Sequence, residues 1–421
     1  MQQKILLLLV LCSLNLNLFA QEALQIPTEP IPHTITERAD WRRYDNGRYT
    51  GLTAQEMRGQ ILPMENIDDH YGSLFFHGNY MIIQNTRRDT RIAAQGVDSI
   101  ISTFYEITED GDFIIENDRG FPALRGFPYI PDEPIRPGSR WQAPGTRAAD
   151  PLNTGHPLVY PFVAEYEYAG TELYMGIPVH RLRATYASRY RREQENGYIP
   201  ALNGIFSISG SHRVDILISA EDGLLIFMRD NLDITYTFSD NTTLRYTGFT
   251  LTFGHGITPM NRIEITTGLE EIFGTPEPVG EQPPQTPPDP ARPFVPDDSG
   301  IEIETVPEGI RLIINDIRFI PDTAEFLPEE RYRLDLIARA LSQIPDRTFL
   351  VEGHTASVGL PTGEMQLSIE RARRMVDELV SRGIAADRFM YIGWGGTRPI
   401  DDNSTEAGRS RNRRVEITIL E

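Results

Sequence analysis

Lysine and cysteine are almost absent from this 421-residue chain, which has one of each, Lys4 and Cys12. Positive charge as a whole is scarce, because 60 acidic residues outnumber 40 basic ones and give a formal net charge of -20. A nucleic-acid partner requires a basic surface that displaces counterions from phosphates. The charge balance therefore argues against nucleic-acid binding.

The motifs of the common enzyme classes are also missing. The eight histidines are scattered and none forms an H-E-x-x-H motif. There is no G-x-S-x-G sequence and no phosphate-binding loop. We therefore expect a non-enzymatic protein without catalytic residues, metal ligands or cofactors.

The first 20 residues are typical of a secretory signal peptide. Lys4 gives a positive start, and the apolar run Ile5–Leu11 is too short to span a bilayer. We expect cleavage after Ala20, which leaves no cysteine for a disulfide, and a protein in the periplasm that associates with the outer membrane. Lipidation of Cys12 is the alternative, although a lipoprotein signal has a small residue before its cysteine and this chain has leucine.

Two β-rich stretches follow the leader. Residues 21–150 are less regular, with strands expected at Tyr80–Ile83 and Ile100–Ile107. Residues 151–274 alternate apolar and polar side chains, which predicts an antiparallel β domain. Within it, Gly248 interrupts the alternation and suggests a bulge.

A proline-rich segment, residues 275–300, separates the β-rich region from the rest of the chain. Proline fixes one backbone torsion and lacks an amide donor, so this sequence cannot form a helix or a sheet interior. We expect an extended linker between domains, open to proteolysis.

Residues 301–421 alternate strand-like and helix-like segments. Pro328 opens one predicted helix, and a second runs from about Glu364 to Arg382 and ends at Gly383. The predicted order is β-α-β-α-β-β, an α+β domain with two helices on one sheet face.

Three motifs in this last region resemble the C-terminal domain of the OmpA family, whose patterns are G-H-T-D, L-S-x-x-R-A and G-R-x-x-N-R-R-V-E. Here they read Gly353-His354-Thr355-Ala356, Leu367-Ser368-Ile369-Glu370-Arg371-Ala372 and Gly408-Arg409-Ser410-Arg411-Asn412-Arg413-Arg414-Val415-Glu416. The resemblance implies the α+β fold and a peptidoglycan-binding site. By this resemblance, the site positions in this chain are Thr355, Ala356, Arg371, Arg409, Asn412 and Arg413.

The chain departs from the family at Ala356, which stands where the family has aspartate. In the family, that aspartate holds the ammonium of the peptidoglycan diaminopimelate, and the arginine equivalent to Arg371 holds its carboxylate. An alanine cannot neutralise an ammonium, so we expect peptidoglycan binding to be weak or lost. Glu364, which replaces a family asparagine, is a possible compensating carboxylate.

These observations favour a cell-envelope protein in which the β-rich region contacts an unknown envelope partner and the last domain faces the cell wall. The alternative makes residues 21–274 an outer-membrane β-barrel with a periplasmic peptidoglycan-binding domain.

Overall fold

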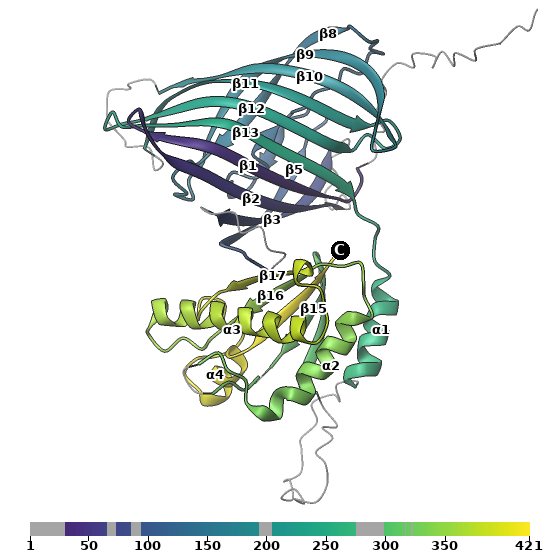
Figure 1. Ribbon diagram of the computed structural model, residues 1–421, viewed down its shortest axis with the longest axis vertical. Coiled ribbons are helices and arrows are strands. Elements are labelled where there is room, and N and C mark those ends of the chain that lie inside the picture. The colour runs from purple at the N-terminus through teal and green to yellow at the C-terminus, as the bar shows by residue number, and fades with distance from the viewer. Residues whose placement is uncertain are drawn as a thin grey trace, which may run out of the picture.

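The computed structural model describes residues 30–64, 73–85, 94–192, 204–274, 299–315, 317–320 and 323–421. The predicted signal peptide and residues 275–298 of the proline-rich segment lie outside these ranges. The described residues form a strongly curled, barrel-like sheet above a smaller α+β unit (Figure 1).

The curled sheet contains twelve of the described strands in the order β6-β5-β3-β2-β1-β13-β12-β11-β10-β9-β8-β7. Their bounds are β1 His33–Asp45, β2 Arg48–Met64, β3 Leu74–Asn85, β5 Ser99–Ile107, β6 Phe113–Ile115, β7 Leu124–Arg125, β8 Arg140–Ala149, β9 Leu158–Tyr174, β10 Ile177–Arg191, β11 Ile205–Ser219, β12 Leu225–Phe238 and β13 Thr243–Gly256. Since β1 pairs with β13 and β8 with β9, residues on both sides of position 150 share this one sheet.

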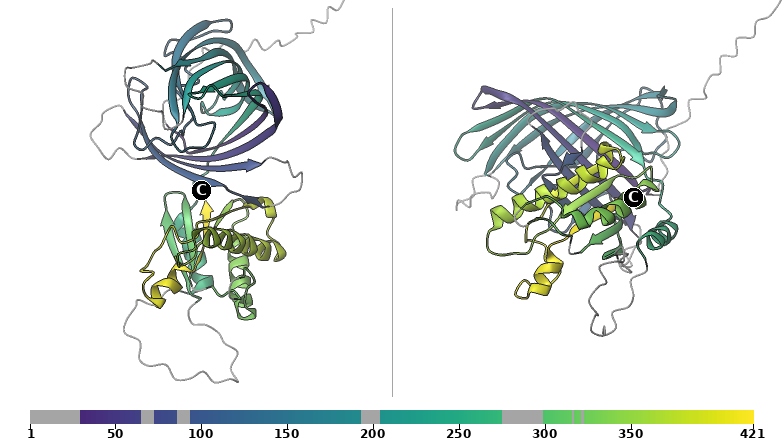
Figure 2. Two further views of the ribbon diagram at one scale, coloured as in Figure 1. Left: turned by 90° about the vertical axis from the view of Figure 1, so that its left-hand side faces the viewer. Right: turned by 60° about the horizontal axis from the view of Figure 1, so that its bottom comes forward.

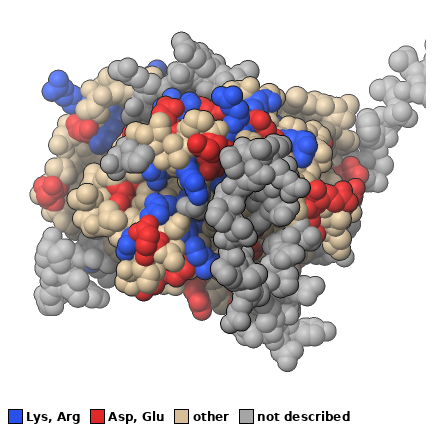
Figure 3. All heavy atoms as spheres, turned by 90° about the horizontal axis from the view of Figure 1, so that it is seen from below, with Lys and Arg blue, Asp and Glu red and all other residues tan. Residues whose placement is uncertain are grey.

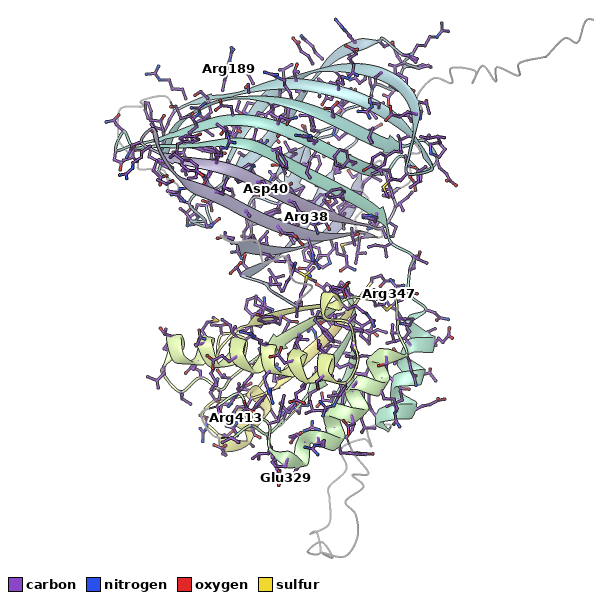
Figure 4. The ribbon with its side chains drawn as sticks, in the orientation of Figure 1. Arg38, Asp40, Arg189, Glu329, Arg347 and Arg413 are labelled. Carbon is purple, nitrogen blue, oxygen red and sulfur yellow. The ribbon has the colours of Figure 1, made fainter. Side chains whose placement is uncertain are left out.

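Alternation along the strands directs aromatic and aliphatic side chains into the curl. On β12, Leu232, Ile234 and Tyr236 are buried together, as the sequence pattern predicts. Charged side chains occupy the outer face, where Arg245 pairs with Asp233 at 2.6 Å. Arg189 likewise extends outward from β10 (Figure 4). The inside of the sheet is therefore mainly apolar, and charged pairs lie on its outside.

The bulge expected at Gly248 does not form, because β13 stays in continuous register with β1 and β12 across this residue. Gly248 has a φ of +157°, and a Cβ atom there would lie 2.2 Å from the carbonyl oxygen of Asp40. The glycine is therefore required by the close approach of β1, and the alternation of faces continues past it.

The α+β unit contains a six-stranded sheet in the order β14-β15-β18-β16-β17-β4. Its elements are β14 Ile301–Val306, β15 Gly309–Ile314, α2 Arg331–Ser342, β16 Phe349–Gly353, α3 Pro361–Ser381, β17 Phe389–Gly393, α4 Glu406–Asn412 and β18 Val415–Leu420, with β4 Gln95–Gly96 added at the edge. The predicted order β-α-β-α-β-β is thus incomplete, because a β14–β15 hairpin opens the unit and the short helix α4 precedes β18. Both predicted helices are present, and Gly383 ends the second one with a φ of +101°.

Helix α1, Arg262–Phe273, precedes the proline-rich segment but packs on the α+β unit. Its Leu269 and Phe273 are buried in the same core as Leu334 of α2 and Leu379 of α3. The elements on both sides of residues 275–298 therefore belong to one unit. We accordingly place the boundary between the two units at residues 257–261, which connect β13 to α1.

The face of the six-stranded sheet opposite its helices packs against the curled sheet (Figures 1 and 2). Met81 and Ile83 of β3 contact an apolar cluster that includes Leu350, Met390 and Ile392. The two units are therefore docked through a buried surface. Of the helices described, none is long and apolar enough to cross a membrane.

Candidate functional site

The candidate site lies where two parallel strands end. Strands β16 and β17 pair in parallel, so the loops that follow Gly353 and Gly393 leave the same edge of the sheet. The amide of Thr355 donates to the carbonyl of Gly395 at 2.9 Å, which joins these loops. A Cβ atom on Gly393 would lie 2.4 Å from Ser368 Oγ, so glycine lets α3 pack closely against the strand.

Ala356 and Glu364 lie on either side of the first loop. Ala356 is buried, with 5% of its surface exposed. Glu364 is also buried, and its Oε1 accepts the amides of Val358 at 2.7 Å and Leu360 at 3.1 Å. The loop after Ala356 is therefore wrapped around the Glu364 carboxylate. The other oxygen, Oε2, lies beside Gly396, where a Cβ atom would approach it to 2.9 Å.

Arg371 lies seven residues after Glu364 on α3, close to two helical turns, so both project from the same side of the helix. Its guanidinium lies over the ring of Phe319, 4.6 Å from the ring centre. Its Nε donates to the carbonyl of Thr323 at 3.3 Å. The predicted carboxylate-binding arginine is thus held against the segment that precedes α2.

The remaining predicted site residues shape the second loop. Asn412 is fully buried, and its Oδ1 accepts the amides of Ile400 and Asp401 at 2.8 and 3.0 Å. Arg409 and Arg413 both form ion pairs with Glu406, at 2.8 and 2.9 Å. One carboxylate therefore offsets part of the positive charge of these two arginines.

Arginines and acidic residues are interspersed over the face of the α+β unit away from the curled sheet (Figure 3). Arg413 lies on this far side (Figure 4). The basic motif of the sequence thus does not produce a purely basic surface here.

A buried charge cluster lies beneath the site. Arg414 donates to Glu416 Oε1 from both Nε, at 2.7 Å, and Nη2, at 2.6 Å. Burial, reinforced by the charge of Arg414, lowers the pKa of His354 to about 2, so this histidine is neutral. Burial and the nearby Glu416 raise the pKa of Glu352. The cluster fixes the start of β18 and explains why His354 and Arg414 are structural residues.

Two further residues hold the site together without having been assigned a role from the sequence. Ser368 is fully buried and its Oγ accepts the amide of Gly395 at 2.8 Å. Asn403 Oδ1 accepts the amide of Ser357 at 3.1 Å and also a bond from Asn412 Nδ2 at 3.0 Å. Ser368 belongs to the L-S-x-x-R-A motif and was therefore detectable, whereas Asn403 lies in a loop without a pattern.

Comparison with known proteins gives matches in this region. Residues 318–413 match the model of the OmpA family. Peptidoglycan-binding protein ArfA of Mycobacterium tuberculosis is 37% identical over 103 residues, which cover 24% of this chain and 32% of that protein. Outer membrane protein A of Bordetella avium is 38% identical over 115 residues, which cover 27% of this chain and 59% of that protein. Each alignment thus spans less than two thirds of the relative.

Among solved structures, the cell wall anchor of the T6SS from Pseudomonas aeruginosa aligns with 28% of this chain and 87% of that chain. The identity is 31% and the TM-score is 0.27.

Proposed function

The C-terminal unit of this chain is an OmpA-family domain, and on this premise we propose that the protein is a non-enzymatic cell-envelope protein that links an envelope partner to the cell wall. The relatives include a peptidoglycan-binding protein and outer membrane proteins. These matches support a location in the periplasm, in association with the outer membrane. The curled sheet is the part that contacts the envelope partner.

The proposal of weak binding depends on two positions of the family site: Arg371 is retained, whereas Ala356 stands where the family has aspartate. Arg371 retains a guanidinium suited to a carboxylate. Ala356 is buried in the loop that follows β16, and its side chain offers an ammonium neither charge nor hydrogen bond. A zwitterionic ligand therefore loses one charge-assisted bond, which typically contributes about 1.5–3 kcal/mol. We infer that peptidoglycan binding is weak.

Glu364 is the candidate for a relocated charge. One of its oxygens is engaged by the amides of Val358 and Leu360. These bonds fix the carboxylate in the loop that follows Ala356. Any compensation by Glu364 would therefore act through Oε2, and it would depend on the loop keeping its present shape.

The outward face of the curled sheet bears on the alternative of a membrane-crossing region. Membrane-spanning strands present an apolar band to lipid. Here Arg181 pairs with Glu172 at 2.6 Å on the outer face, and Arg140 pairs with Glu167 at 2.8 Å. Charged pairs of this kind favour a sheet whose outer face is in contact with water. They support the proposal that the curled sheet contacts an envelope partner.

Sedimentation of the mature protein with purified peptidoglycan tests the proposal. We expect only a small fraction of the protein in the pellet, and we expect Arg371→Ala to remove that fraction. Glu364→Gln keeps the acceptor for the loop amides but removes the charge, so it separates the two readings. Strong binding that Glu364→Gln abolishes would show that the charge has moved, and strong binding indifferent to both variants would contradict the proposed site.

A further inference from the structure

A cavity lies at the junction of the two units, where the chain passes from β13 to α1 (Figure 1). Its volume is about 330 Å³, and ligand pockets typically measure about 300–1,000 Å³. Leu62 of β2 and His77 of β3 line it from the curled sheet. Ile257 lines it from the connection, and Arg262 of α1 from the α+β unit. A molecule bound there would therefore contact both units.

Three neighbouring strands of the curled sheet form one wall of the cavity. Leu62 pairs with His77 across β2 and β3, and His77 pairs with Phe104 across β3 and β5, so the three side chains share one face of the sheet. The residues next to them, such as Ile61 and Phe76, point to the opposite face and are buried in the core of the curled sheet. The cavity thus lies outside the curl, between the curled sheet and the α+β unit.

The lining of the cavity is mostly aliphatic, because it is made of Leu62, Met64, Ile257 and four prolines besides a few polar side chains. Phe104 supplies the one phenyl ring among the lining residues. That ring is already stacked on the imidazole of His77, with 4.5 Å between the ring centres. An aromatic guest gains from stacking on aromatic faces. The lining therefore suits an aliphatic chain better than a ring.

The charged residues of the lining are paired with each other. Arg262 Nε donates to the Glu421 carboxylate at 2.9 Å, and the other oxygen of that carboxylate accepts the amide of Met260 at 3.0 Å. Burial lowers the pKa of His77 below its ordinary value of 6.5 despite the nearby Glu308, so the imidazole is neutral at pH 7. Around the cavity, the described residues thus leave no charge for a ligand to neutralise. The bound group is therefore uncharged.

The cavity is open to solvent and large enough for a chain. Phe104 is 55% exposed and Met64 is 37% exposed, so the apolar lining reaches the surface. An apolar cavity of about 150 Å³ can bind benzene. By that ratio, a volume of about 330 Å³ holds roughly 12 carbon atoms.

We propose that this cavity binds the alkyl chain of a single-chain amphiphile. The chain packs against Leu62 and Ile257, and the polar head stays in water at the mouth beside Met64 and Phe104. Burial of the chain methylenes supplies the affinity. The cavity shares no residue with the proposed peptidoglycan site, so either proposal can fail without the other.

Calorimetric titration of the whole mature protein with decyl maltoside, kept below the concentration at which it forms micelles, tests this site. Maltose, which is the same head without the chain, is the ligand control. We expect saturable binding of decyl maltoside and no measurable binding of maltose. From the hexyl to the decyl compound the affinity should rise by about fourfold per methylene. Tetradecyl maltoside should bind about as tightly as dodecyl maltoside, because the chain then exceeds the cavity.

A matched pair of variants assigns the binding to the cavity. Leu62→Asn places a polar group without a partner against the chain, and it should weaken decyl maltoside binding at least about tenfold. Leu52→Asn should leave binding unchanged, because Leu52 lies on the same face of the same strand, is 66% exposed and does not line the cavity. If Leu62→Asn fails to fold, Phe104→Asn at an exposed position should weaken binding in the same direction.

Four results would each overturn the proposal. They are the absence of saturable decyl maltoside binding, equal binding of maltose, an affinity that keeps rising from the dodecyl to the tetradecyl compound by about fourfold per methylene, and binding that neither Leu62→Asn nor Phe104→Asn weakens.

Discussion

The two sheets of this chain bury their apolar side chains in different ways. The six-stranded sheet buries one face under α1, α2 and α3 and docks the other against a neighbour. The curled sheet buries its own inner face and keeps its outer face charged. In the first, candidate ligand chemistry lies in loops at the strand ends, held by backbone hydrogen bonds. In the second, polar side chains from several strands meet inside, where Arg147 of β8 and His212 of β11 both contact Asp230 of β12.

The largest expected effect concerns the boundary between the two units, because it decides to which unit helix α1 belongs. Phe273 is 4% exposed in the core of the α+β unit, although it precedes the proline-rich segment. Phe273→Ala should lower the free energy of unfolding of that unit by about 3–5 kcal/mol through the cavity it leaves. Chemical denaturation measures this change. The exposed Ile263 on the same helix is the control, and Ile263→Ala should change stability by about 0.5 kcal/mol or less. If Phe273→Ala leaves the unfolding of the α+β unit unchanged, α1 is not part of the core of that unit.

The charge cluster beneath the candidate site predicts a pH dependence in the α+β unit. Burial lowers the pKa of His354 from 6.5 to about 2, so the unfolded chain binds a proton below pH 6.5 that the folded protein does not. The free energy of unfolding is therefore unaffected by this histidine above pH 6.5 and falls below it. At pH 5 the loss is about 2 kcal/mol. Unfolding free energies at pH 7 and pH 5 should therefore differ less in His354→Gln than in the wild type. Equal slopes for the two proteins would contradict the burial of a neutral imidazole.

Proteolysis offers the smallest expected effect. The proline-rich sequence 275–298 is a favourable cleavage site. Because α1 stays embedded in the α+β core after such a cut, the two fragments should remain together. Size-exclusion chromatography should then show an unchanged elution volume, with two bands only after denaturation. A C-terminal fragment that elutes alone would show that the units are joined by a free linker.

The sequence predicts the α+β unit better than the curled sheet for physical reasons. Helices α2 and α3 repeat apolar residues at helical spacing, and proline and glycine mark their ends. Helix α1 lacks such a pattern, since Thr266, Thr267 and Gly268 lie in its middle and are poor helix formers. The start of α1 nevertheless has a signal in the sequence, because asparagine is a favoured helix cap. In the structure, Asn261 accepts the amide of Glu264 at 3.3 Å.

Some features of the candidate site could likewise be predicted from the sequence and others could not. Motif residues such as Arg371 and Asn412 were identifiable from the resemblance to the OmpA family motifs, but the bonds from Glu364 to the loop amides depend on loop conformation. In the curled sheet, alternation indicates that Asp230 faces inward with Leu232. It cannot indicate that Arg147 of β8 lies 3.5 Å from Asp230, because the curl of the whole sheet brings these distant strands together.

The most direct test of the account is the affinity of the C-terminal site for peptidoglycan when its acid is restored. Sedimentation of the mature protein with purified peptidoglycan should show weak binding for the wild type and a gain of about ten- to a hundredfold in affinity for Ala356→Asp. Ala356→Asn, which has the same shape without the charge, should remain weak, and Arg371→Ala should abolish the restored binding. Strong wild-type binding that Ala356→Asp does not increase would contradict the claim that the missing carboxylate weakens this site.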